Sequence, residues 1–144
     1  AQKDKHSASL QRIQIIKGSI TNSGARPSEK VFDVVCSDGL EVDPTTHRCP
    51  DNGARVNIED CSITSNVGAT ELKATWRDPE FNPKDKAFYY VRVLENPTCR
   101  WSTWDALKAG IKPRSDLHET IQERAWSSPI WYIPVPEDID IFAL

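Results

Sequence analysis

Residues 87–94 read AFYYVRVL, and this stretch decides the fold class. Aromatic and β-branched residues pack well on a pleated surface, so the stretch predicts a β-strand. RIQIIK at residues 12–17 and KVFDVVC at residues 30–36 have the same character. The second of these is apolar on both faces, which is typical of a central strand.

Two further stretches predict strands of a less buried kind. Residues 71–77 (ELKATWR) place an apolar side chain at every second position, which is the period of a half-buried antiparallel strand. Residues 128–133 (SPIWYI) predict a strand in which Pro129 and Pro134, which have no N–H to donate to a central ladder, lie at a sheet edge or at the ends of the strand.

One late segment has helical character. Residues 103–110 (TWDALKAG) predict a short helix with Thr103 as N-cap, Asp105 in the first turn and Gly110 as C-cap. Residues 117–124 predict either a second helical turn or an irregular segment.

The order of these elements does not alternate regularly between strand and helix, which argues against a parallel doubly wound sheet. We therefore expect a mainly β protein, an antiparallel β-sandwich-like domain of five or six strands with one or two short helices and long stapled loops. The domain is expected to span residues 10–134, between a flexible N-terminal segment (1–9) and a C-terminal tail (135–144).

The four cysteines indicate the compartment. None belongs to a C-x-x-C pair, and an even count at wide spacing favours two disulfides over four free thiols. Three pairings are possible. We favour Cys36–Cys49, which staples a long loop, and Cys61–Cys99, which ties two β segments together. Disulfides of this kind predict a periplasmic or extracellular protein.

Charge and hydropathy exclude two kinds of partner. The 144 residues include 18 basic and 21 acidic side chains, a net charge of −3, and no run of Lys and Arg exceeds two. Nucleic acid binding needs a clustered positive field, so it is not expected. No apolar stretch approaches the roughly 18 residues of a membrane span. The chain contains no methionine, so we expect it to be a processed product or a piece of a longer protein.

Residues that could carry chemistry are few. The three histidines are isolated, and no serine or cysteine has the context of a nucleophile, so no catalytic residue is predicted here. One oxygen-rich turn offers a calcium candidate, although a polar hairpin connection is the favoured interpretation. Its residues are Asp78, Glu80, Asn82 and Asp85.

Five tryptophans stand out in a chain of this length. Trp76 and Trp131 lie in predicted strands and are expected in the core. Trp101, Trp104 and Trp126 lie around the predicted helix, where they can line an interface with a further domain or form a platform for sugars.

Five segments resemble the C-terminal end of a large bacterial family of secreted or periplasmic proteins of unknown function. The N-terminal part of that family resembles the PHP (polymerase and histidinol phosphatase) class of metal-dependent hydrolases. The segments are LQRIQIIKG (10–18), KVFDVVCSDG (30–39), FYYVRVLE (88–95), RWSTWD (100–105) and TIQERAWSSPIWY (120–132).

The resemblance implies that this chain is the β-rich C-terminal domain or small subunit of a larger hydrolase. Its partner would be the N-terminal part of the same parent protein, or a larger subunit, which would hold a divalent metal. No metal ligand of that part matches a residue here. An autonomous module that binds glycans or proteins through exposed tryptophans is the alternative. Because arginines and aromatics dominate buried contacts, the interface candidates are Arg92, Glu95, Arg100, Trp101, Trp104, Arg124 and Trp126.

Overall fold

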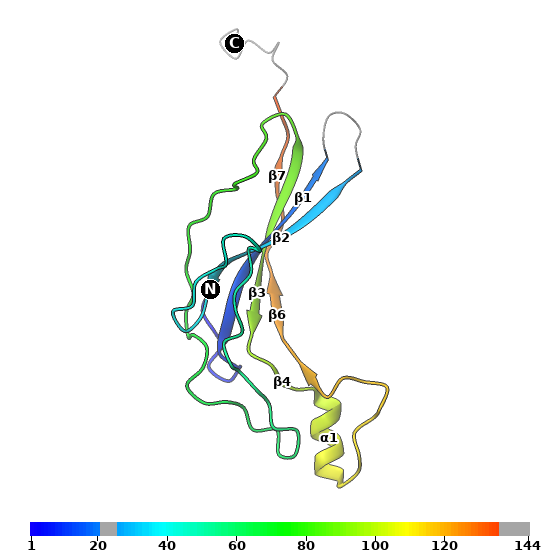
Figure 1. Ribbon diagram of the computed structural model, residues 1–144. Coiled ribbons are helices and arrows are strands. Elements are labelled where there is room, and N and C mark those ends of the chain that lie inside the picture. Colours follow the sequence, from blue (N-terminus) through cyan, green and yellow to red (C-terminus); the bar gives the residue numbers. More distant parts are fainter. Residues whose placement is uncertain (21–25, 136–144) are drawn as a thin grey trace.

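A computed structural model describes residues 1–20 and 26–135, and its main element is one antiparallel sheet (Figure 1). The order is β2-β1-β3-β6, with β7 also paired to β3. The mainly β, antiparallel fold with one short helix is confirmed. The strands are β1 (Leu10–Ile20), β2 (Ser28–Cys36), β3 (Lys86–Glu95), β6 (Arg124–Trp126) and β7 (Ile130–Tyr132). The expected C-terminal tail lies outside the described residues from 136 onward.

The strands β6 and β7 pair with the same edge of β3, and Ser127 follows β6 in the short segment between them. The Ser127 N–H donates to the Val91 carbonyl, and the Val91 N–H donates to the Ser127 hydroxyl, both at 3.0 Å. The serine therefore continues the ladder across the break with its side chain. Pro129 lies just before β7, which pairs with β3 and with no other strand of the described residues, so the prediction of a strand at an edge with prolines at its ends is confirmed.

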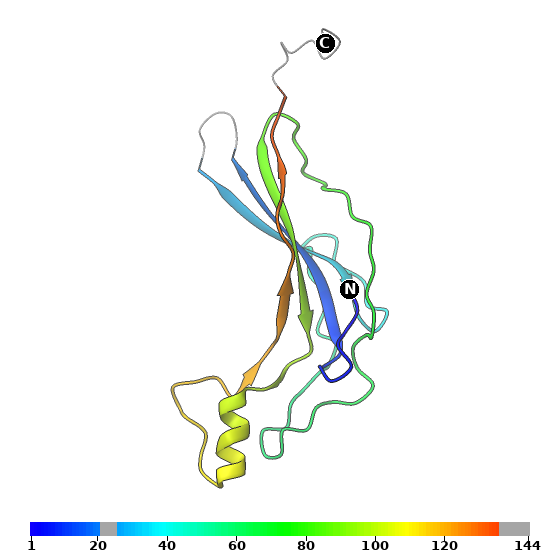
Figure 2. The ribbon, with the colours of Figure 1, turned by 180° about the vertical axis from the view of Figure 1, so that it is seen from behind.

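Long loops, rather than a second large sheet, cover one side of the main sheet (Figures 1 and 2). The prediction of a strand at residues 71–77 is therefore wrong beyond an isolated bridge from Glu71 to Gln2. The segment is extended and points Leu72 and Trp76 at the sheet. An extended chain lying across a sheet has the same period of two as a paired strand, which explains the error.

The helix α1 (Trp101–Ala109) is present but begins two residues earlier than predicted. Arg100 occupies the N-cap, and Thr103 is instead buried inside the first turn, where its hydroxyl donates to the Glu119 carbonyl at 2.8 Å. Asp105 lies beyond that turn. Gly110 ends the helix with φ of 66°, as predicted. Residues 117–124 form no helix and contain β5 (Thr120–Ile121), which pairs with β4 (Thr98–Cys99).

Both predicted disulfides are confirmed. Cys36–Cys49 links the end of β2 to the following loop, and Cys61–Cys99 links the next loop to β4. The N-terminal segment, expected to be flexible, lies against the loop layer. Its Ala1 ammonium donates to the Leu72 carbonyl at 2.6 Å, and the Leu72 N–H donates to the Ala1 carbonyl at 2.9 Å. Among the residues that the structure describes, no helix has the length and apolar character to cross a membrane.

Candidate functional site

The two faces of the main sheet differ in what covers them. On one face, which we call the covered face, Trp76 of the loop layer packs on Phe32 at 5.3 Å between ring centroids and on Tyr89 at 6.4 Å. Beside them Lys17 and Asp78 form an ion pair at 2.6 Å, with both side chains less than a tenth exposed. Burial opposes ionisation of Asp78, but hydrogen bonds from Lys17 and Tyr89 outweigh it and lower the pKa of this carboxyl.

The opposite side of the sheet, which we call the open face, is formed by four rows of residues in register across the strands. Residues directly opposite each other in antiparallel strands project to the same side, and every second residue of a strand does so too. The rows are Glu29, Gly18, Phe88 and Trp131; Val31, Ile16 and Tyr90; Asp33, Gln14, Arg92 and Trp126; and Cys36, Arg12, Leu94 and Arg124.

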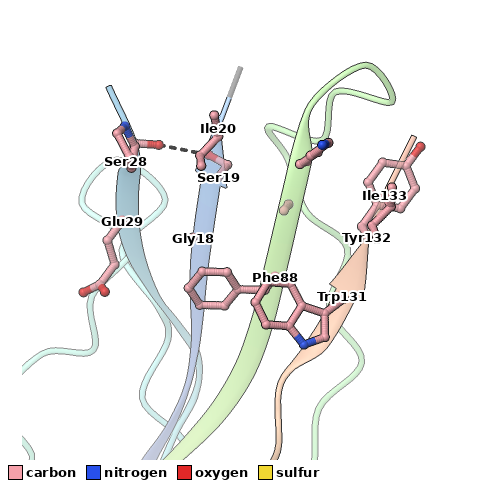
Figure 3. Close-up of a pocket in the computed structure, with 12 residues that line it drawn as sticks. Gly18, Ser19, Ile20, Ser28, Glu29, Phe88, Trp131, Tyr132 and Ile133 are labelled. Atoms are coloured by element: carbon pink, nitrogen blue, oxygen red, sulfur yellow. Dashed lines mark hydrogen bonds between the residues drawn. The ribbon is translucent and has the colours of Figure 1, made fainter. Parts of the chain in front are cut away.

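The first two rows make an aromatic half. Phe88 packs on Trp131 at 5.2 Å between ring centroids and stacks nearly parallel to Tyr90 at 6.4 Å. Figure 3 shows the Phe88 ring lying over Gly18 of β1 with the Trp131 ring beside it. A largely apolar groove of about 560 Å³ adjoins these rings, and Trp131 remains 67% exposed.

Gly18 is required because the Phe88 ring occupies the space of a side chain there. We expect Gly18→Ala to destabilise the fold by about 1–3 kcal/mol, the usual cost of overpacking. Urea unfolding measures this. In a Phe88→Ala background the same glycine substitution should cost much less, because the clash is gone. An equal cost in both backgrounds would contradict this account of Gly18.

The other two rows make an arginine half, organised around a buried carboxylate. The Asp33 side chain is fully buried and accepts hydrogen bonds from Gln14 Nε2 at 2.5 Å and from the Cys49 N–H at 2.7 Å. Arg48 lies 3.6 Å from the same carboxylate. Gln14 in turn accepts a bond at 2.7 Å from Arg92 Nε, so its amide bridges Asp33 and Arg92. The Cys36–Cys49 disulfide helps to hold the Cys49 N–H in place.

A second groove, of about 340 Å³, borders the arginine half near the start of α1. Arg124 and Trp126 of β6 line it together with Arg100 and His118. Trp126 is 60% exposed.

A comparison with protein families matches residues 1–134 to one described as "Protein of unknown function (DUF3604)". The chain belongs to this family. No curated protein and no solved structure matches it. The DUF3604 match extends over both faces of the sheet and the helix, which agrees with the resemblance to a bacterial family of unknown function.

The interface candidates of this DUF3604 chain divide into three groups. Arg92, Arg124 and Trp126 meet on the open face, and Arg100 joins two of them in the groove. Trp101 and Trp104 project from α1, 70% and 42% exposed. Glu95 lies at the end of β3, where burial, with a contribution from the nearby Glu123, raises its pKa.

Three aromatics of the site were not among those candidates. Trp131 was expected in the core, but it is exposed, because β7 pairs with β3 and with no second strand among residues 1–20 and 26–135. Phe88 and Tyr90 belong to the predicted strand at residues 87–94. The period of two in that strand puts them on the same side as Arg92, and this signal could have identified them.

The calcium candidate does not assemble. Asp78 pairs with Lys17, and Glu80 pairs with Lys30. Asn82 accepts the Lys84 N–H at 3.1 Å, and its carbonyl accepts the Asp85 N–H at the same distance. Within residues 1–20 and 26–135 no group of three or more His, Cys, Asp or Glu side chains is arranged to hold a metal ion. The turn is polar, as the alternative interpretation states, but it joins an extended segment to β3 and is not a hairpin.

Proposed function

We propose that this DUF3604 chain is the C-terminal β-domain, or a processed small subunit, of a secreted or periplasmic PHP-like metal-dependent hydrolase. Its open face packs against the part of the parent protein that carries the catalytic barrel and walls one side of the substrate cleft. A divalent metal would belong to that part. The two disulfides support an oxidising compartment. The resemblance of five segments supports the hydrolase.

The observation that carries the proposal is the exposure of two tryptophans on the open face. Trp126 and Trp131 are 60% and 67% exposed on the same side of one sheet. Large apolar groups exposed together mark interaction surfaces, and Trp and Arg contribute most to buried interfaces. Arg92 and Arg124 on the same face form no ion pair within the described part of the chain.

Docking through this face predicts a strong effect of its tryptophans. We expect Trp126→Ala to raise the dissociation constant between the 144-residue chain and the remaining part of the parent protein about tenfold or more. Ile63→Ala is the control, because Ile63 is 46% exposed in the loop layer. Isothermal titration calorimetry measures both. Equal affinities for the two variants would contradict docking through the open face.

An autonomous glycan-binding module is the alternative, favoured by the exposed Trp131 ring beside the apolar groove. Aromatic rings and the C–H faces of sugars are complementary surfaces. Titration of a panel of soluble polysaccharides, followed by tryptophan fluorescence, tests it. A saturable change that Trp131→Ala abolishes would favour the module, and no response across the panel would remove it.

A further inference from the structure

The groove beside the arginine half has an unusual composition for an acidic chain. Arg100, Arg124 and His118 line it with Trp126, and Glu123 is the carboxylate among its lining residues. The whole chain carries a net charge of −3, so this groove has the opposite local charge.

The two arginines have donors to spare. Within residues 1–20 and 26–135 neither Arg100 nor Arg124 forms an ion pair, although Arg48, Arg55 and Arg114 do. The Nε atom of Arg100 is buried and has no hydrogen-bond partner in that part of the chain. A buried donor of a charged group without a partner is unfavourable, so an acceptor bound close to Arg100 would lower that cost. Arg12 Nε is also buried without a hydrogen-bond partner among the described residues, but Arg12 does not line this groove.

The start of α1 borders the groove through Arg100. Arg100 is its N-cap, no side chain caps the first turn, and no acidic residue lies in that turn. The free N–H groups of a helix N-terminus attract negative charge. The guanidinium fork of an arginine matches the oxygens of a carboxylate, sulfate or phosphate. The positive local charge, the unpaired arginines and the helix start therefore all favour the same kind of ligand.

We infer that this groove binds an oxyanion, held by Arg100 and Arg124, with the exposed ring of Trp126 packing on the group that carries it. The inference stands on the groove alone and does not require the hydrolase. Two sources share this chemistry: a free small molecule that carries a carboxylate, sulfate or phosphate, and an acidic side chain of the docked partner.

Titration of the full 144-residue chain with inorganic sulfate and phosphate, at constant ionic strength in chloride, tests the inference. Arginine Nε–H resonances and tryptophan fluorescence are the two readouts. We expect saturable binding that weakens about tenfold in Arg124→Gln and in Arg100→Gln. Arg114→Gln is the matched control, because Arg114 is exposed and paired with Asp116, and it should bind as the parent chain does.

A linear response without saturation, or equal binding by all three variants, would overturn the inference. Arg124 is exposed on an edge strand, so its variant remains informative if Arg100→Gln fails to fold. The same titration on the complex with the larger part separates the two sources. If sulfate displaces the partner, the natural oxyanion is an acidic side chain of that partner. If sulfate binds while the partner stays docked, the natural oxyanion belongs to a small ligand. Saturable sulfate binding to a chain whose open face docks no larger part would support the groove and contradict the docking proposal alone.

Discussion

Replacing Cys61 and Cys99 together by serine is expected to lower the free energy of unfolding by about 4 kcal/mol, on the chain-entropy estimate for the loop they close. The two cysteines are 38 residues apart, and they tie the loop layer to β4. That layer contains no long strand within its described residues, so it has few ladder hydrogen bonds with which to hold its position. The disulfide therefore restricts the unfolded chain and fixes the loop layer in the folded one.

Urea unfolding of the oxidised chain and of the double serine variant measures the effect. The matched control is the double serine variant of Cys36 and Cys49, which are 13 residues apart. Its shorter loop should cost less, about 3 kcal/mol. A loss below about 1 kcal/mol for the Cys61 and Cys99 pair, well under the usual contribution of a disulfide, would show that the loop layer is held by other contacts.

Asp78→Ala is expected to lower the free energy of unfolding by about 3 kcal/mol or more, because it leaves the charge of Lys17 buried without its partner. The Lys17 side chain is only 8% exposed, and Tyr89 loses the acceptor of its hydroxyl at the same time. The pKa of Asp78 is lowered in the folded protein. The stability that it contributes is therefore present above its ordinary pKa and is lost as the pH falls through the lowered value.

Unfolding measurements at neutral and acidic pH test this prediction. Asp116→Ala is the control, since the pair of Asp116 and Arg114 is exposed to solvent and should contribute far less to stability than the buried pair. Adding Lys17→Met to Asp78→Ala should restore much of the lost stability, because the unpaired charge disappears. A double variant as unstable as the sum of its two single variants would exclude this mechanism.

The sequence alone predicted the three long strands of the sheet, because residues 12–17, 30–36 and 87–94 combine β-branched and aromatic side chains with short length. It predicted β7 as well, but not the short strand β6. It also predicted both disulfides, Cys36–Cys49 because that pairing staples a long loop and Cys61–Cys99 because that pairing ties two segments together. It failed at residues 71–77, where an extended segment packs on the sheet without pairing. Local pattern does not distinguish these two situations, because both alternate side chains in the same way.

The candidate site was predicted only in part, for a related reason. The arginines and tryptophans of residues 92–126 were identified by type, but the rows that assemble them depend on which strands pair and in what register. The bridge from Arg92 through Gln14 to Asp33 joins three strands. The exposure of Trp131 depends on its position in an edge strand. Neither feature has a signal within a single segment.

The most direct test of the proposed docking is native mass spectrometry of the protein isolated from its source, combined with metal analysis. The proposal predicts that the sequence described here is recovered within, or bound to, a larger species that contains a divalent metal. A single species of 16.2 kDa without metal would contradict it.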